Sequence, residues 1–217
     1  MGFKEKLIQY RKYAKMSDLG IIARRKFFNN AFDGALTCAG IISGIFIIFL
    51  NEPSTFEAQD VLITGFATAL AIGISGLWGA FLSEEAERKK KVLDMKKEMA
   101  EIEEEPKREF KYIKNKYKKG KKPRTLLEKA EKFATIVASL VDGAAPVLGS
   151  SLPLIPFFFG ISLNLLHFIF SYVILVCLLT YLGVFLGQIS GGGRLRYALH
   201  LITAGLVTLI VSILLGI

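Results

Sequence analysis

Five long apolar runs separated by blocks of charge are the feature that most constrains this chain. The runs lie at about residues 27–50, 61–82, 132–158, 161–187 and 195–216. An apolar α-helix needs about 20 residues to cross a bilayer, whereas a membrane β-strand needs only about 10. The sequence therefore predicts an all-α fold, a polytopic membrane protein with five transmembrane helices, rather than a soluble domain.

The distribution of basic residues predicts how these spans are oriented. All 28 lysines and arginines lie in residues 1–28, 84–132 and 188–196, while residues 51–60 carry only acidic charges. Segments rich in lysine and arginine stay in the cytosol, so the N-terminus is expected in the cytosol and the C-terminus outside. The formal net charge of +9 is thereby explained by topology, and no nucleic-acid partner is expected.

Charge and hydropathy divide the chain into four parts. These are a basic amphipathic segment suited to anionic lipid, spans 1 and 2, a cytoplasmic charged helical insert, and spans 3 to 5, at residues 1–26, 27–83, 84–131 and 132–217. Acidic side chains repeat along the insert and are candidates for capturing cations at the inner mouth of the pathway, although ordinary helix ion pairs with the surrounding lysines are the simpler explanation. They are Glu84, Glu87, Asp94, Glu98, Glu101 and Glu105.

An internal repeat places an aspartate inside two of the spans. Asp33-Gly34-Ala35, followed by Gly40, recurs 109 residues later as Asp142-Gly143-Ala144, followed by Gly149 (142 − 33 = 109). A carboxylate in the middle of a membrane helix costs roughly 2.5–3.5 kcal/mol, so each needs a partner, a proton or a cation. Gly34 and Gly143 would also let helices approach closely, which favours a homodimer with the aspartates near one another.

Proline makes span 3 a candidate source of backbone ligands. Pro146 removes the amide that would bond the carbonyl of Asp142, and Pro153 and Pro156 release further carbonyls. Broken membrane helices coordinate cations in transporters, although a simple kink would use the same prolines. We therefore predict a divalent-cation pathway, with His167 acting either in interhelical hydrogen bonding or as a proton relay or ligand. Its expected residues are Asp33, Asp142, Thr37, Gly149 and His167.

Three stretches resemble the vacuolar iron transporter-like family of plants, fungi and prokaryotes. Asn30–Gly34, followed by glycines at 40 and 44, resembles the first span of that family. Gly149–Pro156 resembles its glycine-to-double-proline signature, and 193–216 is similar to its last span. The resemblance implies a five-span homodimer that exports ferrous or manganous ion from the cytosol in exchange for protons, with Asp33 as the pathway aspartate. It also aligns Gly76 and Ala80 with a methionine and a glutamate of the family.

The function expected from the sequence is therefore transport of a divalent metal ion, iron or manganese. The ion is the substrate, so no tightly bound cofactor and no enzymatic activity are expected. Two alternatives stay open: a scaffold or anionic-lipid-binding protein, and a lipid-headgroup transferase. The transferase motif that begins with Asp-Gly-Ala needs further acidic residues, which the apolar part of span 2 lacks.

Overall fold

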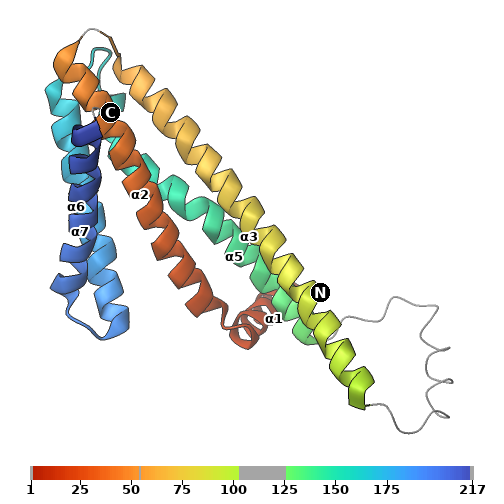
Figure 1. The fold of residues 1–217 in the computed structure, drawn as a ribbon. Coiled ribbons are helices and arrows are strands. Elements are labelled where there is room, and N and C mark those ends of the chain that lie inside the picture. Colours follow the sequence, from red (N-terminus) through yellow and green to blue (C-terminus); the bar gives the residue numbers. More distant parts are fainter. Residues whose placement is uncertain (1, 54, 103–125, 216–217) are drawn as a thin grey trace. The chain divides into compact units, whose positions relative to one another are not determined.

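The computed structural model describes residues 2–53, 55–102 and 126–215. Its elements are, in order, α1 (Phe3–Met16), α2 (Leu19–Asn51), α3 (Ala58–Ile102), α5 (Leu126–Ser151), the 3₁₀ helix η1 (Leu152–Phe158), α6 (Leu165–Ser190) and α7 (Arg194–Leu215), as Figure 1 shows. Five segments of the described residues are long and apolar enough to cross a membrane: Leu19–Asn51, Ala58–Glu87, Lys129–Phe158, Leu165–Ser190 and Arg194–Leu215. The predicted all-α, five-span fold is confirmed.

Span 3 is not one continuous α-helix. Pro146 lies inside α5, but the α-helix ends at Ser151 and η1 continues to Phe158 with Pro153 and Pro156 in it. A proline has no amide hydrogen and clashes with the carbonyl four residues earlier, so two prolines in quick succession prevent further α-helical turns. The last part of the third span is therefore a tighter helix with different hydrogen bonding.

The helix of span 2 continues beyond the apolar run. α3 extends without interruption to Ile102, as expected from the absence of a helix breaker before Pro106. The lysine-rich part of the predicted insert, 107–124, lies outside the described residues. Its cytoplasmic placement remains a prediction.

The chain forms two compact units. Unit 1 comprises 1–20 and 79–138, and unit 2 comprises 21–78 and 139–217. In unit 1 the ring of Phe133 stacks on Tyr10, with centroids 5.1 Å apart, and also contacts Tyr13. The basic N-terminal helix α1 is thus held to α5 by aromatic side chains, while Leu7 and Ile8 are exposed.

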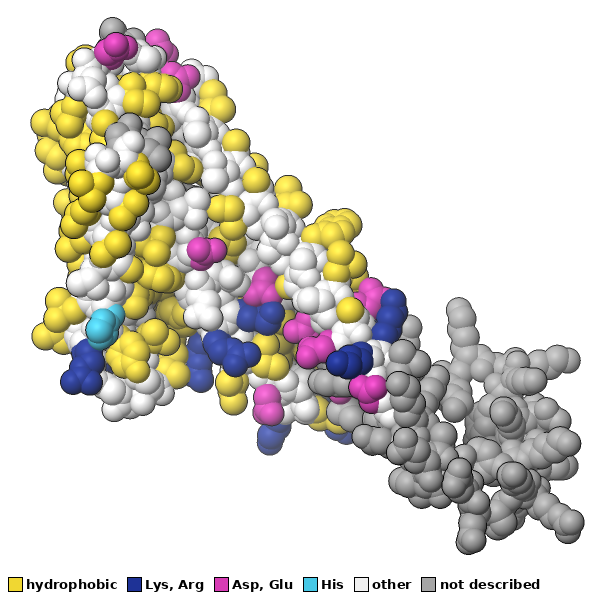
Figure 2. All heavy atoms as spheres, in the orientation of Figure 1, with side chains coloured by type: hydrophobic (Ala, Val, Ile, Leu, Met, Phe, Trp, Pro, Cys, Tyr) yellow, Lys and Arg dark blue, Asp and Glu magenta, His cyan; other side chains and the backbone are white. Residues whose placement is uncertain are grey.

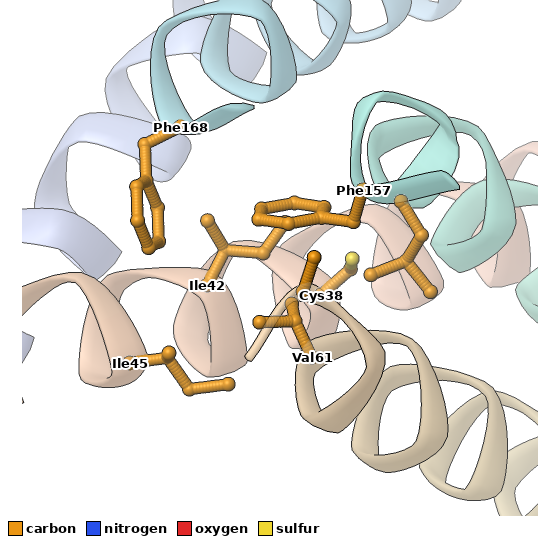
Figure 3. Close-up of a cluster of buried hydrophobic side chains, with 8 residues drawn as sticks. Cys38, Ile42, Ile45, Val61, Phe157 and Phe168 are labelled. Carbon is orange, nitrogen blue, oxygen red and sulfur yellow. The ribbon is translucent and has the colours of Figure 1, made fainter. Parts of the chain in front are cut away.

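The main hydrophobic core of unit 2 joins four elements. Cys38, Ile42 and Ile45 of α2 meet Val61 of α3, and Figure 3 shows Phe157 of η1 and Phe168 of α6 on the same cluster. A short bridge between Glu57 and Ser162 closes this end of the unit. The core therefore fixes the ends of α2 and η1 against the starts of α3 and α6.

Helices α2 and α5 run in the same direction within unit 2. Residue numbers rise together along both helices in their contacts, from Asn30 with Asp142 to Gly34 with Ser150. This agrees with the predicted topology, in which span 2 lies between spans 1 and 3 and these two spans therefore cross the membrane in the same direction. The same register places Asp142 beside residues that precede Asp33 on α2, so the two aspartates are not directly opposite one another.

The last two spans form a hairpin. Gly191 ends α6 with a left-handed backbone (φ 65°), and α7 returns along α6. Gly183 packs directly on the backbone of Ala198. Figure 2 shows that hydrophobic side chains dominate the visible surface of these spans, as expected for helices that face lipid or another apolar surface.

Candidate functional site

Asp142 is the buried carboxylate of unit 2, and both of its oxygens have donors. The Lys26 ammonium lies 2.5 Å from Oδ2, and the Asn30 amide nitrogen donates to Oδ1 at 2.6 Å. The side chain of Asp142 is 9% exposed and that of Lys26 is 22% exposed. The neutralisation that an intramembrane aspartate requires is therefore supplied here by a lysine of the same chain.

Helix periodicity explains why α2 presents these donors together. Lys26, Asn30 and Gly34 are spaced four residues apart, so they lie on one face of α2. Gly34 contacts α5 directly, since a Cβ added there would lie 2.2 Å from the carbonyl oxygen of Pro146. Close approach at Gly34 brings the two side chains before it within reach of Asp142.

The carbonyl that Pro146 releases faces a different helix from the carboxylate of the same residue. The Asp142 carbonyl oxygen lies against Gly76 of α3, where an added Cβ would be 2.8 Å away. The carboxylate instead points to Lys26 and Asn30 of α2. The expected oxygen cluster of carboxylate and released carbonyl is therefore divided between two neighbouring helices.

Gly76 has a packing reason to be glycine. Together with Gly73, whose own position faces the carbonyl of Gly143, it lets α3 approach the backbone of α5. A methionine at position 76, as the family resemblance would place there, has no room in this arrangement. Ala80, at the position of the expected glutamate, is half-buried and offers no ligand.

Asp33 differs from Asp142 in burial and in the partners of its carboxylate. It is exposed, and its carboxylate has no hydrogen bond or ion pair with any described residue. Thr37, the neighbour expected to share its site, donates its hydroxyl to the main-chain oxygen of Asp33 at 2.9 Å. Thr37 therefore caps a turn of its own helix and leaves the carboxylate available.

His167 lies at the start of α6, with both ring nitrogens engaged. The Asn164 amide donates to Nδ1 at 3.1 Å, and Nε2 lies 3.2 Å from the carbonyl oxygen of Phe159. Because Nδ1 accepts a hydrogen bond from the main-chain amide of Asn164, Nε2 is the ring nitrogen that can donate to the carbonyl oxygen of Phe159. The ring also stacks on Phe157 at 5.8 Å. These contacts favour the hydrogen-bonding interpretation, although they join a loop to its helix rather than two spans.

The remaining candidates do not form a cluster with Asp33. Gly149 packs on the backbone of Ala31, where an added Cβ would lie 2.1 Å from the Ala31 carbonyl oxygen. The hydroxyl of the next residue, Ser150, donates to the carbonyl oxygens of Gly34 and Pro146. Within the described residues, no group of three or more His, Cys, Asp or Glu side chains is placed to hold a metal ion. The five predicted pathway residues are thus spread along unit 2.

The acidic stripe of the insert is described only at its beginning. Glu84 is half-buried, and Glu87 and Asp94 are exposed on α3, where neighbouring Glu85 pairs with Lys89 at 2.9 Å. Glu98 and Glu101 belong to α3, but their side chains lie outside the description, as does Glu105 altogether. Capture of cations by this stripe remains a prediction.

Lys26 and Asn30 are the site residues that sequence reasoning missed. Their four-residue spacing on the face that continues into Gly34 was a usable signal. The register between α2 and α5 could not be predicted from the sequence, because it depends on which glycine of one helix contacts which carbonyl of the other.

Comparison with known proteins relates this chain to a family. The VIT family matches residues 25–142. An uncharacterized protein of Methanocaldococcus jannaschii is 25% identical over 166 residues, which cover 76% of this chain and 74% of that protein. Since the family match spans more than half of the 217 residues, the chain belongs to the VIT family, whose members are membrane metal-ion transporters.

Proposed function

We propose that this protein exports a divalent metal ion, ferrous or manganous, from the cytosol in exchange for protons, and that it does so as a homodimer. The observation that carries the proposal is Asp33, an exposed carboxylate in a span of the matched family stretch, without a partner among the described residues. Such a group is too costly to face lipid and requires a cation, a proton or another subunit.

The surroundings of Asp33 support a pathway at a subunit boundary. Its neighbour Gly34 faces α5, so consecutive residues place the glycine inward and the aspartate outward on α2. Two copies that meet along this outward face would bring two carboxylates to one axis. Close carboxylates share protons readily, and a divalent ion displaces those protons when it binds.

The oxygen chemistry fits the proposed ions only in part. Carboxylates suit Mn²⁺ and other hard divalent ions, while a thioether would favour softer ones. Because Gly76 carries no methionine side chain, we place manganese before iron as the preferred substrate.

Transport by purified protein in vesicles tests the proposal. Mn²⁺ uptake should rise when an opposing proton gradient is imposed, and Asp33→Asn should abolish it without changing the thermal unfolding temperature of the purified protein. Glu52→Gln is the matched control, since Glu52 is an exposed acid at the end of α2 and should be dispensable. Uptake by Asp33→Asn at the wild-type rate, or no uptake of either ion by wild type, would reject transport.

A lipid-binding scaffold is the second candidate, favoured by one observation. Helix α1 carries five basic residues and exposes Leu7 and Ile8, a combination suited to an anionic membrane surface. It explains the charge of unit 1 but gives no role to Asp33. Loss of transport in every condition, with retained binding to anionic vesicles, would establish it instead.

A further inference from the structure

The carboxylate of Asp142 is held by one positively charged side chain, Lys26, and one hydrogen-bond donor, Asn30. The ammonium nitrogen is 2.5 Å from one carboxylate oxygen, and the Asn30 amide nitrogen is 2.6 Å from the other. The carboxylate is almost completely removed from solvent, with 9% of the side chain exposed. In this structure the ionised carboxylate is compensated by the positive charge of Lys26.

The other aspartate of the repeat has no such arrangement. Asp33 and Asp142 both precede Gly-Ala, yet the Asp33 carboxylate is exposed and has no donor among the residues described. Equivalent sequence positions thus differ: Asp142 has a positively charged partner, and Asp33 has none among the described residues. At Asp142 the positive charge belongs to Lys26, which is itself a residue of α2.

We propose that Asp142 is a cation-binding site with a built-in occupant: the Lys26 ammonium takes the position of a divalent ion, so that of the two repeated aspartates only Asp33 stays exchangeable. This assignment rests on the proposed function only in naming divalent ions as the competing ligand. Lys26 then determines how many ions a chain binds.

The Lys26 ammonium has an advantage over a free divalent ion in binding the Asp142 carboxylate. A tethered group acts at an effective concentration of about millimolar, so a free ion must overcome that advantage to displace it. Without the ammonium, the two Asp142 oxygens remain, and rotation of the Asn30 amide would add its oxygen. Carboxylate and amide oxygens are the ligands that Mn²⁺ prefers.

Removing Lys26 tests the proposal directly. The purified full-length chain in detergent is titrated with Mn²⁺ alone by calorimetry, comparing wild type with Lys26→Met, which has similar volume and no charge. The variant should bind one more Mn²⁺ per chain than wild type, and Mn²⁺ should raise its unfolding temperature by a larger shift. Both gains should vanish in Lys26→Met/Asp142→Asn, and Lys26→Arg should bind as wild type does.

Equal Mn²⁺ binding by wild type and a folded Lys26→Met would overturn the proposal. So would an extra ion that persists in the double variant, since that ion would not be at Asp142. If Lys26→Met does not fold, Asp142→Asn decides: it should bind as many Mn²⁺ ions as wild type, and fewer would show that Asp142 is already an ion ligand. A wild type that binds no Mn²⁺ would count against the proposed function alone, because Lys26→Met would still gain its one ion.

Discussion

The carbonyl oxygen of Pro146 faces Gly34 so closely that a Cβ at position 34 would lie 2.2 Å from it. This contact between α2 and α5 has no side chain that could move away. It sits one helical turn beyond Asn30 and therefore also sets the distance from Asn30 and Lys26 to Asp142.

Gly34→Ala should therefore destabilise the protein, since helix backbones would have to separate. Overpacking of this kind costs about 1–3 kcal/mol. Thermal unfolding in detergent should show a clear fall for Gly34→Ala. Gly40→Ala is the control, because its nearest neighbour is a Thr208 methyl group at 3.9 Å. Equal unfolding temperatures for the two variants would contradict the described packing.

Gly76→Met should not create a better metal transporter, although it introduces the residue that the family resemblance expects. Its Cβ would meet the Asp142 carbonyl oxygen at 2.8 Å, so α3 would be pushed from α5 at a cost of about 1–3 kcal/mol. Gly79→Met, in open space, should be tolerated. Unfolding temperature and Mn²⁺ uptake of both variants check this, and faster uptake by a stable Gly76→Met would show that the packing argument fails.

Ser171→Ala should lower stability by about 1 kcal/mol, since its buried hydroxyl donates to the carbonyl oxygen of Pro153 at 2.6 Å. The matched control is Thr180→Ala, whose exposed hydroxyl bonds only to its own helix at Val176. Chemical unfolding of the two variants in mixed micelles compares them. The contact is unimportant if Thr180→Ala proves the more damaging change.

His167→Ala should reduce stability while preserving uptake per folded molecule. The imidazole holds Asn164 and Phe159 together, and loss of two hydrogen bonds is worth about 1–2 kcal/mol. His200→Ala, at an exposed position on α7, should change neither quantity. Loss of proton-coupled uptake in a stable His167→Ala variant would instead identify a proton relay.

Labelling with an impermeant thiol reagent should distinguish the two sides of the membrane. In a background without Cys38 and Cys177, a cysteine at Glu52 should react from outside intact cells and a cysteine at Lys90 only after permeabilisation. The expectation follows from the confinement of lysine and arginine to three segments. The reverse pattern would invert the topology and with it the proposed direction of transport.

Span number and helix class followed from the sequence because they depend on apolar length and charge alone. The bounds of α2 and the change to η1 were less accessible: Leu19 starts α2 well before the apolar run, and Pro153 alters the hydrogen-bonding pattern locally. The ion pair at Asp142 was out of reach, since it requires the register between α2 and α5. A single sequence reports that two aspartates need compensation, but not that Lys26 supplies it for one of them.

Within unit 2, helix α5 has close main-chain contacts with two neighbours, at Gly34 and Gly149 toward α2 and at Gly73 and Gly76 toward α3. Contacts made by side chains can adjust through changes of rotamer, but contacts between backbones have no such freedom. These three helices of unit 2 should consequently shift together as one body during a transport cycle. If Asp33 carries the ion as proposed, its alternating exposure to the two sides of a membrane would come from movement of this body against whatever covers its outer face. Slow steps of the cycle should then be insensitive to side-chain size within the body.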